Sequence, residues 1–150
     1  MIIDPAGAED LDTVRALFRE YEAMLGEDLC FQGFEQELSG LPGKYAPPSG
    51  CLLLASEASG CVALRAIDAG TCEMKRLFVR PAFRGRGLGR QLAARSIEEA
   101  RAAGYRVMLL DTLDRLTEAR ALYASLGFQP VAPYYRNPLP GVVYLKLELA

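Results

Sequence analysis

A glycine-rich segment between a predicted strand and a predicted helix constrains the fold more than any other feature of this sequence. Residues 84–90 read Arg-Gly-Arg-Gly-Leu-Gly-Arg. Glycine permits a positive φ angle and a close approach of the backbone to a ligand. The N–H groups at the start of the following helix favour negative charge. We therefore expect a turn that binds phosphate or pyrophosphate, the alternative being a tight turn with merely exposed arginines.

Charge is distributed unevenly along the 150 residues, which carry 17 basic and 19 acidic side chains for a net charge of −2. Residues 1–74 contain 4 basic and 13 acidic residues, whereas residues 75–90 contain 6 basic residues and no acidic one. A net negative chain is not expected to attract nucleic acid, and no exposed basic helix accompanies the short basic segment. A local phosphate site is the better prediction.

The chain contains no histidine. This excludes Ser-His-Asp and Cys-His catalysis and histidine-ligated metals. The four cysteines (Cys30, Cys51, Cys61 and Cys72) form no C-x-x-C pair, so we predict no metal site and expect buried, reduced thiols. The N-terminal residues do not resemble a signal peptide, and no apolar stretch approaches the ~20 residues that span a bilayer. We expect a cytoplasmic protein without a membrane partner.

Apolar periodicity predicts a single domain over residues 1–150 in which helices and strands alternate. Antiparallel strands precede a β-α-β unit, which predicts an α/β (α+β) fold: a mixed, twisted sheet with helices on both faces. Helices are expected at 8–25, 33–40, 87–103 and 117–126, and strands at 1–3, 51–55, 61–65, 72–79, 106–111, 128–131 and 142–149.

Two nucleotide-binding motifs fail to match the glycine-rich segment. The Walker pattern requires a Lys-Ser/Thr pair that is absent here. The dinucleotide pattern G-x-G-x-x-G would place its third glycine at Arg90 or Leu92, depending on the starting glycine. A nucleotide-binding regulator is therefore disfavoured.

The pattern that does fit is R-x-x-G-x-G, formed by Arg84, Gly87 and Gly89, which resembles the acetyl-CoA-binding signature of the GNAT superfamily of N-acetyltransferases. Residues 73–81 are similar to the strand before that loop, and residues 121–128 (Ala-Leu-Tyr-Ala-Ser-Leu-Gly-Phe) resemble the family's helix-to-strand element. Residues 133–138 further resemble a group of small bacterial members. The resemblance implies the GNAT fold, with a mostly antiparallel sheet of about six or seven strands.

The resemblance also implies how acetyl-CoA would bind. The backbone of Leu77, Phe78 and Val79 would pair with the pantetheine arm as an added strand does. The pyrophosphate would lie on the turn formed by Arg84, Gly85, Arg86, Gly87, Leu88, Gly89 and Arg90. One position departs from the family pattern: Leu116 stands where many relatives carry an asparagine that contacts the CoA arm. Thr112 or Thr117 is expected to replace that contact.

Two residues correspond to the family's catalytic groups. Glu73 stands where many members carry a general-base glutamate, and its alternative role is a structural pair with Lys75 or Arg65. Tyr123 matches the tyrosine that protonates the departing CoA thiolate, and its alternative role is core packing. An acyl-cysteine at Cys72 is disfavoured because strand alternation sends it to the face opposite Glu73.

The resemblance places the acceptor pocket on the first two helices and the loop before the last strand. That region supplies Tyr21, Phe31, Phe34, Tyr134, Tyr135, Arg136 and Asn137, whose aromatic members have core packing as the alternative. The acidic first half favours a cationic amine, whereas Arg136 favours a substrate carboxylate, and the two remain open.

The sequence thus predicts an acyl-CoA-dependent N-acyltransferase. We expect acetyl transfer from acetyl-CoA to a primary amine of a small molecule, by direct attack in a ternary complex that yields CoA. The alternative is a non-catalytic acyl-CoA-sensing module of the same fold. The family resemblance allows a homodimer, although no sequence feature specifies the contact.

Overall fold

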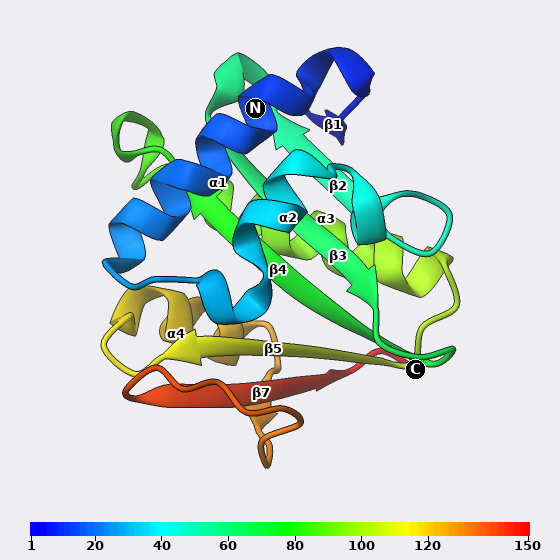
Figure 1. The fold of residues 1–150 in the computed structure, drawn as a ribbon. Helices are drawn as coiled ribbons and strands as arrows, with labels where there is room; N and C mark the ends of the chain where they lie inside the picture. Colours follow the sequence, from blue (N-terminus) through cyan, green and yellow to red (C-terminus); the bar gives the residue numbers. More distant parts are fainter.

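The computed structural model describes all 150 residues, arranged around one seven-stranded sheet of order β1-β2-β3-β4-β5-β7-β6 (Figure 1). All neighbouring strands are antiparallel except β4 and β5, which are parallel. The predicted mixed, mostly antiparallel sheet is therefore confirmed. The strands are β1 (Ile3–Pro5), β2 (Cys51–Ala55), β3 (Gly60–Ala66), β4 (Thr71–Val79), β5 (Val107–Leu113), β6 (Gln129–Pro130) and β7 (Val142–Glu148).

Helices cover both faces of the sheet, as predicted (Figure 1). The apolar stripes of α1 (Leu11–Leu25) and α2 (Phe34–Ser39) bury one face, and α3 (Leu88–Ala102) and α4 (Thr117–Ser125) bury the other. Burial of such stripes is the main source of helix stability in a folded protein. None of these helices is long and apolar enough to cross a membrane.

A gap opens between β4 and β5 because their pairing stops early. The two strands pair from Thr71 and Val107 only as far as Glu73 and Leu109. Beyond that point β5 continues to pair with β7 up to Leu113, while β4 continues alongside β3. Figure 1 shows β4 and β5 diverging from a common end. Over their last residues the two strands therefore do not pair with each other, and the Val79 carbonyl accepts a hydrogen bond of 3.0 Å from Nε of Arg84.

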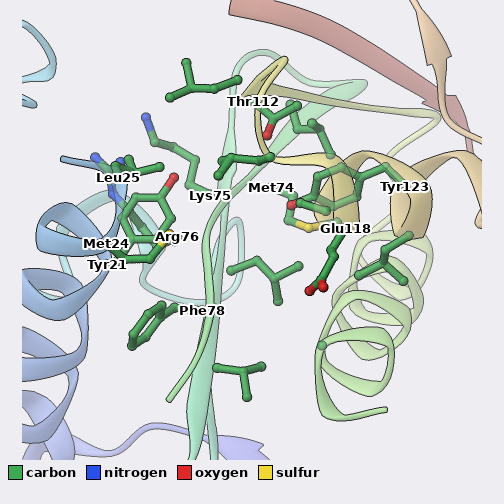
Figure 2. Close-up of a pocket in the computed structure, with 18 of the residues that line it drawn as sticks. Tyr21, Met24, Leu25, Met74, Lys75, Arg76, Phe78, Thr112, Glu118 and Tyr123 are labelled. Carbon is green, nitrogen blue, oxygen red and sulfur yellow. The ribbon is translucent and has the colours of Figure 1, made fainter. Parts of the chain in front are cut away.

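A β-bulge in β4 lies beside this gap. Ala63 of β3 faces Lys75 and Cys61 faces Phe78, so β4 carries one extra residue between these pairs. Arg76 adopts a positive φ of 62° there. Lys75 and Arg76 consequently extend toward the same side of the sheet, that of α1 (Figure 2). Bulges bend a strand and redirect side chains, and this one turns two cations toward one face.

Close packing of β3 against β4 leads to a prediction for Gly60. A Cβ atom at this position would lie 2.6 Å from the backbone oxygen of Phe78 and 3.0 Å from a Leu92 methyl. We expect Gly60→Ala to lower the free energy of unfolding by about 2 kcal/mol, because the backbone oxygen cannot move aside easily. Chemical denaturation measures the change. Gly70→Ala is the matched control, since its Cβ would meet nothing within 4 Å.

Candidate active site

A cavity of about 560 Å³ joins the glycine-rich turn to the gap between β4 and β5 (Figure 2). Its walls come from α1 on one side and α4 on the other, with the last residues of β4 and β5 between them. Three of the predicted cofactor-binding strand residues line it, Leu77, Phe78 and Val79. The cavity therefore connects the predicted phosphate site with the centre of the sheet.

The turn at one end of the cavity has the geometry of an anion site. Gly87 precedes α3 with φ of 77°, and its carbonyl accepts the helix's first bond from the N–H of Gln91 at 3.1 Å. The N–H groups before Gln91 therefore have no partner inside the helix. Of the predicted phosphate-binding residues, the cavity is lined by Arg84, Gly85, Gly87, Leu88 and Gly89.

The other two arginines of the turn do not line the cavity. The guanidinium of Arg86 lies over the Phe83 ring, 5.7 Å from its centre. Arg90 donates a hydrogen bond of 2.7 Å to the Ser125 hydroxyl of α4. Both side chains are exposed, so they add positive charge around the turn without contacting the cavity.

Tyr123 reaches from α4 into the cavity (Figure 2). Its side chain is 8% exposed and packs edge-on against Phe128. Its hydroxyl has no hydrogen-bond partner in the protein. Burial raises the pKa of this phenol above its ordinary value, so the group keeps its proton at neutral pH. A protonated hydroxyl facing an open cavity is suited to proton donation.

Glu73 is fully buried and does not line the cavity. One of its carboxylate oxygens accepts a hydrogen bond of 2.8 Å from Nε of Arg65, and the other accepts one of 2.5 Å from the hydroxyl of Tyr134. The structural pairing with Arg65 that the sequence allowed is thus present. Lys75, the other suggested partner, donates instead to the Gln32 side chain at 3.2 Å.

Asp111 is a cavity residue that the sequence reasoning did not single out. It lies on β5, two positions beyond the last residue paired with β4. Its carboxylate accepts hydrogen bonds from the hydroxyl of Tyr135 and, at 2.8 Å, from the Asn137 amide. The sequence does contain a signal for this residue, because a carboxylate follows the apolar run of residues 107–110 at the end of the predicted strand 106–111.

The predicted acceptor residues separate into three groups: residues that line the cavity described above, residues that line a second cavity, and residues that line neither. Tyr21 and Asn137 line the first cavity. A second, adjoining cavity of about 670 Å³ is lined by residues that include Phe31, Tyr135 and Arg136.

Phe34 and Tyr134, which were also predicted as acceptor residues, line neither cavity. Phe34 begins α2 and is 1% exposed, because its ring packs into the core and under the Arg76 guanidinium at 5.1 Å. Tyr134 is turned inward by its hydrogen bond to Glu73.

The position that departs from the family pattern also faces the cavity. Leu116 lines it together with Thr112 and Thr117, so two hydroxyl groups flank the apolar side chain.

Cys72 is buried in the core beneath α3, on the face of the sheet opposite α1 and α2. Burial raises the pKa of its thiol to about 12, which keeps it from acting as a thiolate nucleophile.

Known proteins resemble this chain in sequence and in fold. Residues 12–128 match the Acetyltransferase (GNAT) family. The chain is 46% identical over 147 residues to an uncharacterised N-acetyltransferase of Schizosaccharomyces pombe, covering 95% of this chain and 90% of the relative. An acetyltransferase structure from Streptococcus agalactiae superposes with a TM-score of 0.81 at 21% identity, covering 98% of this chain and 97% of that one. A GNAT family acetyltransferase from Elizabethkingia anophelis, solved with acetyl-CoA bound, superposes with a TM-score of 0.65 at 22% identity, covering 98% and 97%.

The fold is the one that these acetyltransferase structures share, built on a sheet in which β4 and β5 diverge. By its match over most of its length, the chain belongs to the GNAT acetyltransferase family and is an N-acetyltransferase.

Proposed function

We propose that the protein transfers an acetyl group from acetyl-CoA to a primary amine of a small molecule by direct attack in a ternary complex. The observation that carries the proposal is the single cavity that joins the glycine-rich turn, the edge of β4 that β5 leaves unpaired and the Tyr123 hydroxyl. The acetyl-CoA bound to the Elizabethkingia anophelis relative supports the choice of donor. Direct attack needs no enzyme nucleophile, which agrees with a chain that lacks histidine.

The residues along the cavity suit successive parts of acetyl-CoA. The free N–H groups at the start of α3 would bind the pyrophosphate, with Arg84 beside them. The edge of β4 that β5 leaves unpaired, at Leu77 to Val79, would pair with the two amides of the pantetheine arm, with Arg84 giving up its hydrogen bond to the Val79 carbonyl. Thr112 and Thr117 would supply hydroxyl contacts at the position where Leu116 cannot. The bound thioester would supply the electrophilic carbonyl, and these contacts would hold it near Tyr123.

A thermal-shift experiment with acetyl-CoA tests donor binding. We expect acetyl-CoA to raise the melting temperature, and Gly87→Ala to lose most of that increase because alanine resists a φ of 77°. Gly26→Ala is the matched control: its φ is 68°, its Cβ would also meet nothing within 4 Å, and it lies outside the cavity. Stronger stabilisation by ATP or NAD than by acetyl-CoA would contradict the proposal.

Turnover is tested by the release of free CoA thiol in the presence of a panel of primary amines. We expect thiol release that depends on the amine, at a rate well above that of acetyl-CoA hydrolysis without an amine. Tight acetyl-CoA binding without turnover on any amine would instead support the acyl-CoA-sensing module.

The acceptor ammonium must lose a proton before it attacks, and two carboxylates are candidates to assist. Glu73 is the residue that the family resemblance suggests, but both of its oxygens are occupied. Asp111 faces the cavity directly and is the better placed of the two. We propose that Asp111 holds the ammonium and accepts its proton, directly or through water, while Glu73 fixes Tyr134 and Arg65.

Substitution of the two carboxylates separates these roles. We expect Asp111→Asn to lower kcat/KM by about tenfold at neutral pH, since one general base typically contributes this much or more. The loss should diminish at alkaline pH, where the amine is already neutral in solution. Glu73→Gln is expected to lower the melting temperature and leave this pH dependence unchanged. A pH-dependent defect in Glu73→Gln alone would return the base role to Glu73.

A further inference from the structure

The second cavity is strongly basic, in contrast to the acidic half of the chain that forms most of it. Its walls carry the side chains of Lys44, Arg65, Lys75 and Arg136, and a single acidic side chain, Glu37. Both oxygens of Glu37 are bound by the Arg76 guanidinium, at 2.7 and 2.9 Å, so its charge is already compensated. The remaining charge in the cavity is positive.

Arg65 is paired with Glu73, but the other three cations, Lys44, Lys75 and Arg136, have no carboxylate partner. Lys75 makes one hydrogen bond, to the neutral Gln32 side chain, and no ion pair within 4.0 Å. Arg136 is exposed at the rim and likewise forms no ion pair. A half-buried ammonium without an anion is costly, and burial lowers the pKa of Lys75 to about 8. An incoming anion would remove that cost, so the site favours a negatively charged ligand.

The second cavity adjoins the first at the point where acetyl transfer is proposed. Gln32 and Lys75 line both cavities. Asp111 lies on β5 and lines the first cavity, whereas Lys75 lies on β4 between the two cavities. Both residues follow the last pair that joins β4 to β5. They are on opposite strands of the gap without forming an ion pair. One ligand would therefore meet a carboxylate on the donor side and cations on the other side.

We propose that the second cavity is the acceptor site, and that the acceptor is an amine that also carries an anionic group, a carboxylate or a phosphate. The anionic group binds to Lys75 and Arg136, and the ammonium end reaches Asp111 in the first cavity. This inference rests on the proposed function and names its substrate class. The sequence left open whether the acceptor is a cationic amine or carries a carboxylate that Arg136 binds. The proposal favours the second.

Matched acceptors test the proposal without requiring the natural substrate. Amino acids are compared with their primary amides, which keep the amine and the shape but lack the negative charge, and with O-phosphoethanolamine. We expect kcat/KM for the acids to exceed that for the amides by about tenfold or more, because an unpaired, half-buried cation rejects the neutral analogue. Preference for phosphoethanolamine over every amino acid identifies a phosphate as the anionic group. Equal use of acids and amides, or a preference for diamines, overturns the proposal.

Substitutions in the second cavity should remove the preference selectively. Lys75→Met and Arg136→Gln are expected to raise KM for the acids about tenfold while changing kcat/KM for the amides by less than about threefold. Arg136 is exposed, so Arg136→Gln tests the proposal even if Lys75→Met folds poorly. Lys146→Met is the matched control, because Lys146 pairs with Glu148 on β7 and lines neither cavity.

Binding measurements separate this inference from the proposed function. If no acceptor is acetylated, calorimetry of acids and amides against the CoA complex decides: binding of the acids alone supports the site, and binding of neither overturns it. If acetyl-CoA binds and the amides are acetylated as well as the acids, the proposed function stands and the anionic acceptor is rejected.

Discussion

Tyr123→Phe is expected to lower kcat by about a hundredfold, the usual contribution of one general acid, while acetyl-CoA binds as before. When the amine attacks the thioester, the departing CoA thiolate must gain a proton. The Tyr123 hydroxyl lies in the cavity, has no other hydrogen-bond partner, and keeps its proton because burial raises its pKa. Phenylalanine keeps the packing against Phe128 and removes only the proton donor.

Steady-state kinetics and the melting temperature with acetyl-CoA are the two readouts for this variant. Tyr105→Phe is the matched control, because Tyr105 is a buried tyrosine on the same face of the sheet whose hydroxyl donates to the Ser49 carbonyl outside the cavity. We expect that control to lose some stability and to keep kcat. If Tyr123→Phe behaves in the same way, the role of Tyr123 is core packing and the thiolate takes its proton from water.

The fold was predictable because its signals are local. Apolar stripes at helical spacing, the glycine-rich turn and the alternating last strand each depend on neighbouring residues in the chain. The order of these elements then restricts the topology, because a parallel strand must follow the α3 crossover. Both the mixed sheet and the helices on its two faces follow from such information.

The candidate site was less predictable because it depends on contacts between distant segments. The hydrogen bonds that Arg65 and Tyr134 donate to Glu73 join residues up to 61 positions apart in the chain. Phe34 looked like a pocket aromatic, yet it lies under Arg76, 42 positions further along the chain. The bulge at Arg76 left no sign in the apolar pattern, because an extra residue is inserted without glycine or proline.

Regional charge was similarly misleading about the acceptor. Residues 1–74 carry most of the acidic side chains, but many of these are exposed to solvent or are paired with arginines. The four cations of the second cavity come from segments between residues 44 and 136 and meet only in the folded chain. Local potential in a cleft is set by the side chains that line it, so the cavity and not the sequence average indicates the ligand.

Glu37→Gln is expected to lower the free energy of unfolding by about 3 kcal/mol, because it leaves the Arg76 guanidinium buried without its counter-charge. The Arg76 side chain is 2% exposed, and Glu37 holds it with two hydrogen bonds at the β4 bulge. Burial raises the pKa of Glu37, but the bonds and charge of Arg76 outweigh it, so the pKa lies below its usual 4.5. A lowered pKa adds stability above pH 4.5, and that stability disappears as the pH falls through the folded-state value.

Denaturant unfolding at several pH values tests both parts of this expectation. The difference between wild type and Glu37→Gln should be largest at neutral pH and shrink below pH 4.5, where the wild-type carboxylate also becomes neutral. Glu35→Gln is the matched control on the same helix, since its pair with Arg19 is exposed and should contribute little. The double variant Arg76→Met, Glu37→Gln should recover most of the lost stability if the cost is an uncompensated charge, because glutamine keeps an acceptor for the hydroxyl of Tyr45. The structure of the double variant would then show whether the bulge, and the gap between β4 and β5, depends on the ion pair or on the strand alone.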